Sequence, residues 1–235
     1  MYKLAPSILS ADFTVLGNSL NALEKAGAHY VHFDVMDGHF VPNLTFGIPV
    51  LKSIRASTKL AFDVHLMVAD PEKYLEPFAK AGADIISFHL ESFDKEEDEE
   101  GVSRCIQKIR ELEKKVGIAV NPHSPLDSIL PYVEQVDMVL IMSVEPGFGG
   151  QALLPFTLGK AERLANYIQQ NGLETDIEMD GGIDIGNLRT VLNAGVNVVV
   201  AGTSIFGASD ISYGVQRFLE TFASYEIRKK KRARQ

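Results

Sequence analysis

Short apolar runs alternate with amphipathic stretches along the whole chain, and this alternation constrains the fold more than any other feature. The stretches between the runs carry apolar residues at helical spacing, which predicts helices over residues 13–26, 71–81, 102–115, 155–170 and 187–194. Eight runs have the length and the β-branched or aromatic side chains of strands: residues 4–9, 30–35, 60–67, 84–90, 116–120, 137–142, 176–179 and 197–201.

Two folds are built from such alternation, a (β/α)8 barrel and a doubly wound open sheet. Several of the apolar runs are nearly continuous, as expected for parallel strands that are buried on both faces. Eight units in 235 residues give about 29 residues each, close to the usual size of a βα module. No Gly-x-Gly-x-x-Gly turn follows the first run, which argues against a dinucleotide-binding open sheet. We predict a single-domain (β/α)8 TIM barrel over residues 1–227.

The charge of the chain is unevenly distributed. The net charge is −8, yet the last eight residues, 228–235, hold six basic residues and no acidic one. The composition favours a disordered, solvated tail over a contact with nucleic acid. Neither a signal peptide nor a membrane-spanning run is visible, and a single cysteine fits a reducing compartment. We expect a cytoplasmic protein with no membrane partner and no nucleic-acid partner.

The second strand-like run carries polar side chains on one face. Alternate side chains of a strand share a face, so His32, Asp34 and Met36 point one way while Val31 and Phe33 point the other. An imidazole and a carboxylate on an otherwise apolar strand are costly to bury unless something uses them. A metal ion would use both.

The carboxyl ends of the strands of such a barrel meet at one face, where catalytic residues gather. This brings His32 and Asp34 together with His65 from the third run and Asp180 after the seventh. Mixed imidazole and carboxylate ligands suit one divalent transition metal and do not choose among Zn, Fe(II), Mn and Co. The alternative is that the histidines are ordinary core residues, but their positions on adjacent strands favour the metal. No organic cofactor is expected.

Glycine-rich turns follow the last three strands. Backbone N–H groups after strands seven and eight of these barrels often bind phosphate, because glycine lets the chain approach an anion closely. The alternative is that they are simply tight turns. No Walker-type Gly-x-x-x-x-Gly-Lys is present, so a nucleoside triphosphate is not expected. The turns are Gly147-Phe148-Gly149-Gly150, Gly181-Gly182 and Gly202-Thr203-Ser204.

Taken together, these segments resemble the ribulose-phosphate 3-epimerase family. The matching stretches are residues 5–13, 32–43, 63–67, 144–151 and 180–183, so the resemblance covers nearly the whole chain to about residue 207. It implies the (β/α)8 fold and a divalent metal held by His32, Asp34, His65 and Asp180, with Asp34 and Asp180 as the acid/base pair. The residues that it implies at the substrate are Ser7, His65 and Asp180, the phosphate-binding Gly147, Phe148, Gly149, Gly150, Gly181, Gly182, Gly202 and Thr203, and a pocket wall of Met36, Met67 and Met142.

The reaction implied by the resemblance belongs to the pentose phosphate pathway. It interconverts D-ribulose 5-phosphate and D-xylulose 5-phosphate by metal-assisted two-base proton transfer at C3 through an enediolate, with a small sugar phosphate as the partner of a homo-oligomeric isomerase. Two alternatives stay open. One is a 3-epimerase of a hexulose 6-phosphate such as allulose 6-phosphate, and the other is a non-catalytic module that binds a sugar phosphate or nucleic acid.

Overall fold

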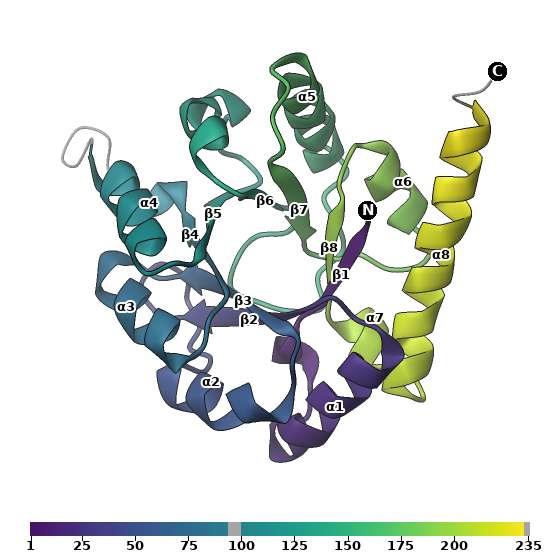
Figure 1. The fold of residues 1–235 in the computed structure, drawn as a ribbon, viewed down its shortest axis with the longest axis horizontal. Helices are drawn as coiled ribbons and strands as arrows, with labels where there is room; N and C mark the ends of the chain where they lie inside the picture. The colour runs from purple at the N-terminus through teal and green to yellow at the C-terminus, as the bar shows by residue number, and fades with distance from the viewer. Residues whose placement is uncertain (94–99, 233–235) are drawn as a thin grey trace.

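A barrel of eight parallel strands forms the centre of the molecule in a computed structural model, which describes residues 1–93 and 100–232 (Figure 1). The strands hydrogen-bond in the order β1-β8-β7-β6-β5-β4-β3-β2, and a bridge between Ser7 and His32 joins the two ends of the sheet. The predicted (β/α)8 barrel is therefore confirmed. The strands are β1 (Lys3–Pro6), β2 (Tyr30–Met36), β3 (Ala61–Met67), β4 (Ile85–His89), β5 (Lys115–Val120), β6 (Met138–Met142), β7 (Asp176–Asp180) and β8 (Val198–Ala201).

Helices surround the barrel and cover the outer face of its strands (Figure 1). All five predicted helices are present, as α1 (Leu16–Ala26), α3 (Glu72–Ala81), α4 (Gly101–Glu111), α5 (Thr157–Gln170) and α6 (Leu188–Asn193). Three further helices were not predicted: α2 (Ile48–Ile54), α7 (Thr203–Phe206) and α8 (Ile211–Arg232). Between β5 and β6 the described chain forms only 3-10 turns, over Leu126–Ser128 and Leu130–Gln135.

Two segments differ from the prediction. The first strand ends at Pro6 rather than at residue 9, because the Ser7 hydroxyl accepts the Leu9 N–H and starts a 3-10 turn over Ile8–Ser10. The C-terminal tail is helical through residue 232, as the end of α8, so the predicted disorder is wrong for residues 228–232. Lys and Arg are good helix formers, and positive charge is favourable at a helix C-terminus. Residues 233–235 lie outside the described part of the chain.

The register between β2 and β3 places polar side chains in pairs inside the barrel. Asp34 lies beside His65, His32 beside Asp63, and Met36 beside Met67. The alternate residues face outwards, where Phe33 packs against Phe78 of α3 with ring centroids 6.2 Å apart. The apolar core therefore lies between strands and helices, while the barrel interior carries the polar groups. No helix in the described residues is long and apolar enough to span a membrane.

Candidate active site

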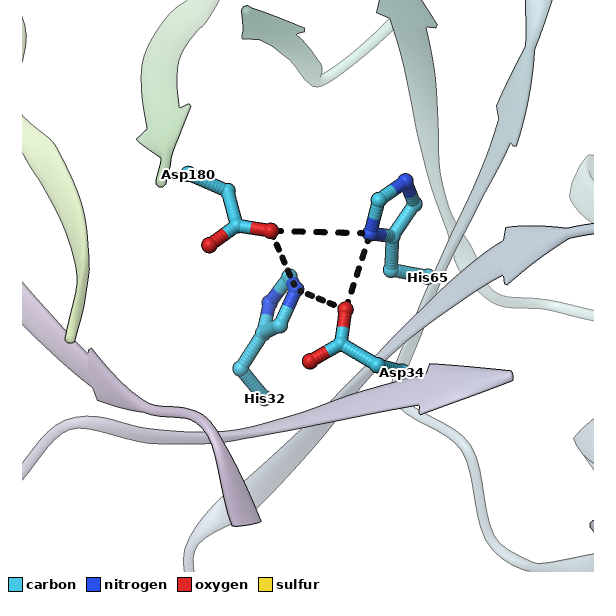
Figure 2. Close-up of side chains that lie close together, drawn as sticks. All are labelled: His32, Asp34, His65 and Asp180. Carbon is cyan, nitrogen blue, oxygen red and sulfur yellow. Dashed lines mark hydrogen bonds and ion pairs between the residues drawn. The ribbon is translucent and has the colours of Figure 1, made fainter. Parts of the chain in front are cut away.

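Four side chains converge at the carboxyl ends of β2, β3 and β7 (Figure 2). Asp34 Oδ1 lies 3.2 Å from His32 Nε2 and 3.1 Å from His65 Nδ1. Asp180 Oδ2 faces the same two nitrogens at 3.8 and 3.9 Å. These are the four residues that the sequence assigned to a metal ion, and their ligand atoms all lie within 4.8 Å of one another. The structure thus brings the predicted set together.

The spacing of the four atoms fits a divalent transition metal. Bonds of about 2.1 Å to a tetrahedral metal place neighbouring ligand atoms about 3.4 Å apart, and the four distances above run from 3.1 to 3.9 Å. His32 Nε2 is buried and points at this centre, but it forms no well-aligned hydrogen bond, although Asp34 Oδ1 lies 3.2 Å away. A buried polar atom without a well-aligned hydrogen bond is costly, so a ligand here would satisfy it. We conclude that the donor set, the spacing and this nitrogen all fit a metal.

Neighbouring groups fix the orientation of the proposed ligands. The second ring nitrogen of His32, Nδ1, lies 2.7 Å from Asp63 Oδ2, so Nε2 is the nitrogen left to face the centre. The Ser7 hydroxyl donates to the other oxygen of Asp34, Oδ2, at 2.5 Å. Ser7 was predicted to contact the substrate, and it does line the pocket, but it also holds Asp34 in place.

The surroundings drive the protonation of the two carboxyls in opposite directions. Burial alone would raise the pKa of Asp34, but His32 and His65 outweigh it and lower that pKa well below its usual value. Burial, followed by the negative charge of Asp34, raises the pKa of Asp180 to about 7. Burial disfavours a charge on His32, yet Asp34 and Asp63 outweigh it and raise the pKa of this imidazole. The protein without metal therefore holds one carboxyl ionised and eases protonation of the other.

The polar interior continues beyond the predicted residues. His65 Nε2 lies 2.8 Å from His89 Nε2, and His89 Nδ1 lies 3.2 Å from Glu91 Oε2. Burial and the nearby His65 help to lower the pKa of His89 to about 4, although Glu91 opposes this. Glu178 is fully buried with both carboxylate oxygens unpartnered, and burial raises its pKa.

The sequence did not assign roles to these buried groups. Asp63 and Glu178 stand two residues before His65 and Asp180, and His89 stands two before Glu91. That spacing of two places each pair on one face of a strand. The spacing was a usable signal, but the partner of each group depends on pairing between strands, which the sequence does not state.

The glycine-rich turns border the same pocket. A side chain cannot be added to them without displacing backbone: a Cβ on Gly182 would lie 2.2 Å from Leu153 N, and one on Gly181 would lie 2.8 Å from Val144 N. Both glycines also have positive φ values, +126° for Gly181 and +64° for Gly182. Backbone of this conformation, without a Cβ in the way, suits the close approach of an anion. The predicted cradle residues that line the pocket are Gly147, Phe148, Gly149, Gly150, Gly181, Gly182, Gly202 and Thr203.

The remaining predicted residues divide between the pocket and the layer beneath it. Met36, Met67 and Met142 line the pocket, as does Asp34. His65 was predicted to contact substrate as well as metal, but it is fully buried and is not among the lining residues. The structure therefore places His65 behind Asp34 and Asp180.

Comparisons with known proteins find chains that are similar to this one over nearly its whole length. The model of the ribulose-phosphate 3 epimerase family matches residues 3–206. Ribulose-phosphate 3-epimerase of Synechocystis sp. is 49% identical over 213 residues, which cover 90% of each chain. The enzyme of that name from Bacillus subtilis is 44% identical over 211 residues, covering 89% of this chain and 94% of the relative. A solved 3-hexulose-6-phosphate synthase from Salmonella typhimurium, 15% identical, aligns over 95% of this chain and 99% of its own with a TM-score of 0.66, which supports the fold alone.

Proposed function

The chain belongs to the ribulose-phosphate 3-epimerase family and is a carbohydrate epimerase, and we propose that Asp34 and Asp180 are its acid/base pair. The reaction interconverts D-ribulose 5-phosphate and D-xylulose 5-phosphate by removing a proton from C3 and returning one to the opposite face. The observation that carries the proposal is the convergence of two carboxylates, from separate strands, on one point beside the pocket.

Two-base epimerisation needs one ionised and one protonated group at any moment. The protein lowers the pKa of Asp34 and raises that of Asp180, so its own surroundings already separate the two roles. Asp34, held by the Ser7 hydroxyl, would accept the proton from C3. Asp180 would deliver a proton to the other face, and the roles exchange in the reverse direction.

We also propose that His32, Asp34, His65 and Asp180 hold one divalent ion, which is Zn, Fe(II), Mn or Co. Bound there, the ion supplies Lewis-acid stabilisation of the negative charge that develops on the substrate oxygens. The spacing of the four ligand atoms and the lack of a well-aligned hydrogen bond at His32 Nε2 support this. The two histidines would hold the ion without transferring protons.

The glycine-rich turns would hold the phosphate end of the substrate. Gly181 and Gly182 follow Asp180 directly, so a phosphate bound at their N–H groups would place the sugar carbons over the carboxylates. The buried methionine side chains of Met36, Met67 and Met142 would form a polarizable wall beside the planar intermediate.

The nearest alternative substrate is a hexulose 6-phosphate, which would use the same carboxylates in a roomier pocket. The relatives at 44% and 49% identity are named for ribulose phosphate, which favours the pentose. A non-catalytic binding module is disfavoured because all four residues of the carboxylate and histidine set are present and converge.

The test is epimerase activity of the purified protein loaded with each of the four metals in turn. Proton NMR would follow conversion of D-ribulose 5-phosphate, and kcat/KM would be compared with that for allulose 6-phosphate. We expect a clear preference for the pentose. A preference for the hexulose would overturn the substrate, and inactivity with every metal would favour a binding module.

We further propose that the enzyme is a cytoplasmic homo-oligomer. The sequence holds a single cysteine, Cys105, which is buried, and this low cysteine content suits a reducing compartment. Phe13 and Val15 are 51% and 43% exposed and line one groove, which supports contact with a second copy. Light scattering of the purified protein would measure the assembly.

A further inference from the structure

A chain of three side chains leads from the metal set towards the carboxyl ends of β4 and β5. It runs from His65 through His89 to Glu91, with contacts of 2.8 Å between the two Nε2 atoms and 3.2 Å from His89 Nδ1 to Glu91 Oε2. Both imidazoles are fully buried, and the Glu91 side chain is 22% exposed. Figure 2 shows the outer ring nitrogen of His65, the start of this chain, pointing away from Asp34 and Asp180.

Counting hydrogens shows that the chain has two possible directions. Two neutral imidazoles carry one N–H each, and the carboxylates at the two ends, Glu91 beside His89 Nδ1 and Asp34 beside His65 Nδ1, can only accept. If His89 donates to Glu91, its Nε2 accepts from His65 Nε2–H, and the lone pair of His65 lies on Nδ1, facing Asp34 and Asp180. If His65 donates to Asp34 instead, the order is reversed, so the tautomer of His65 depends on which carboxylate receives the N–H.

We propose that Glu91 is a positioning residue that sets the tautomer of His65 through His89 and so prepares Nδ1 to bind the metal. The inference rests on the metal site proposed above. Metal-binding histidines are commonly oriented through their other ring nitrogen by a carboxylate or carbonyl. Here the carboxylate acts through a second imidazole. His32 presents the opposite nitrogen, Nε2, because Asp63 engages its Nδ1 directly.

The far end of the chain is anchored so that Glu91 cannot turn freely. Its second oxygen, Oε1, accepts the backbone N–H of Asn121 at 2.8 Å. The Lys160 ammonium donates to the carbonyls of Asn121, Pro122 and Ser124 at 2.7 to 2.9 Å, which holds this loop in place. At the near end, the Phe40 ring packs on His89 with centroids 4.8 Å apart.

This anchoring makes Glu91→Gln a sharp test. The fixed Asn121 N–H requires the amide oxygen of the glutamine, so the amide NH₂ turns towards His89 Nδ1. His89 must then carry its hydrogen on Nε2, and His65 must carry its own on Nδ1, the nitrogen that faces the metal. Glu145→Gln is the matched control, because Glu145 contacts the exposed His123 at 2.9 Å.

Two measurements would be made on each protein. Nitrogen-15 NMR of histidine-labelled, metal-free protein reports which ring nitrogen of His65 carries hydrogen, and competition with a chelator gives the Zn²⁺ affinity. We expect Glu91→Gln to move the hydrogen to Nδ1 and to weaken Zn²⁺ binding about 10- to 100-fold. Glu145→Gln should change neither.

A second pair of variants keeps the test decisive if Glu91→Gln folds poorly. His89→Gln can accept from His65 through its carbonyl and donate to Glu91 through its amide, so affinity should be retained. His89→Leu can do neither and should weaken binding. Unchanged tautomer in Glu91→Gln, or weaker Zn²⁺ binding without a change of tautomer, would overturn the inference. Failure of the unaltered protein to bind Zn²⁺ at His65 would instead overturn the proposed metal site.

Discussion

Asp34 on β2 and Asp180 at the end of β7 approach the same two histidine nitrogens from separate strands. Asp34 Oδ1 lies 3.2 and 3.1 Å from His32 Nε2 and His65 Nδ1, and Asp180 Oδ2 lies 3.8 and 3.9 Å from the same atoms. β8 and β1 lie between β7 and β2 in the barrel. Two carboxylates that reach one point from separate strands can serve opposite faces of a substrate carbon.

We expect Asp34→Asn and Asp180→Asn to separate proton exchange from epimerisation. Each variant keeps one carboxylate, which can remove the C3 proton of one epimer and return a solvent proton to the same face. Epimerisation should fall about 10²- to 10⁴-fold. In D₂O, one variant should exchange C3 of ribulose 5-phosphate and the other that of xylulose 5-phosphate, as followed by proton NMR.

The comparison requires matched metal content, because both carboxylates are proposed ligands. Asp70→Asn is the control, since Asp70 pairs with Lys73 at the surface and its loss should leave turnover unchanged. If fully metal-loaded variants both exchanged the same epimer, the assignment of one carboxylate to each face would be wrong.

His65→Ala should lower the affinity for Zn²⁺ at least about tenfold, because it removes one of four ligand atoms. Elemental analysis after dialysis against a fixed concentration of free Zn²⁺ measures the occupancy. His123→Ala is the control, because the His123 side chain is 72% exposed, and this variant should bind Zn²⁺ like the unaltered protein. Equal occupancy in the two variants would remove His65 from the ligand set.

Gly182→Ala should impair binding of the phosphate group. The added Cβ would lie 2.2 Å from Leu153 N, so the turn must move. Gly172→Ala is a close control, because both glycines have φ near +64° and a Cβ on Gly172 meets nothing within 4 Å. Both variants should lose about 1 kcal/mol of stability from strain in the left-handed region.

Only Gly182→Ala should raise KM, and we expect an increase of roughly tenfold, which corresponds to about 1.4 kcal/mol of lost binding. Competitive inhibition by inorganic phosphate gives a second readout, and its Ki should rise in parallel. An equal rise of KM in both variants would show that strain, rather than the cradle, is responsible.

The strands were predictable because nearly continuous apolar runs mark buried parallel strands. The helices were less predictable from the sequence. Residues 48–54 form α2, which is too short to reveal a helical period and has Pro49 near its start. In α8 the basic end conceals the pattern, and packing stabilises the helix: Tyr2 of the N-terminal segment contacts Phe222, with ring centroids 5.7 Å apart. Such long-range contacts are not visible in local sequence.

The metal set was predictable because each member lies on, or directly after, a strand-like run, two of them at a spacing of two. The groups that orient these ligands were not predictable from the sequence. His89 touches His65 through pairing of β3 with β4, and Glu91 is fixed by the backbone of Asn121 after β5. The sequence shows that polar residues follow these strands, but only the register shows which atoms meet.

Zn²⁺ binding should release more protons at pH 6 than at pH 8. In the metal-free protein, burial and the charge of Asp34 raise the pKa of Asp180 to about 7. Asp34 and Asp63 raise the pKa of His32 well above its usual value, against the effect of burial. Below pH 7 the metal must therefore displace a proton from Asp180 that is already lost above pH 7. Affinity should rise with pH about tenfold more steeply per unit below pH 7 than above it.

Calorimetry in two buffers with different enthalpies of ionisation counts the protons released. We expect about one proton more to be released at pH 6 than at pH 8, because each ligand must be deprotonated to bind. Asp180→Asn removes the group that titrates near pH 7, so this variant should release the same number of protons at pH 6 and at pH 8. If the unaltered protein also released the same number at both pH values, Asp180 would already be ionised at pH 6. The proposal that the surroundings give the two carboxyls different pKa values would then be wrong.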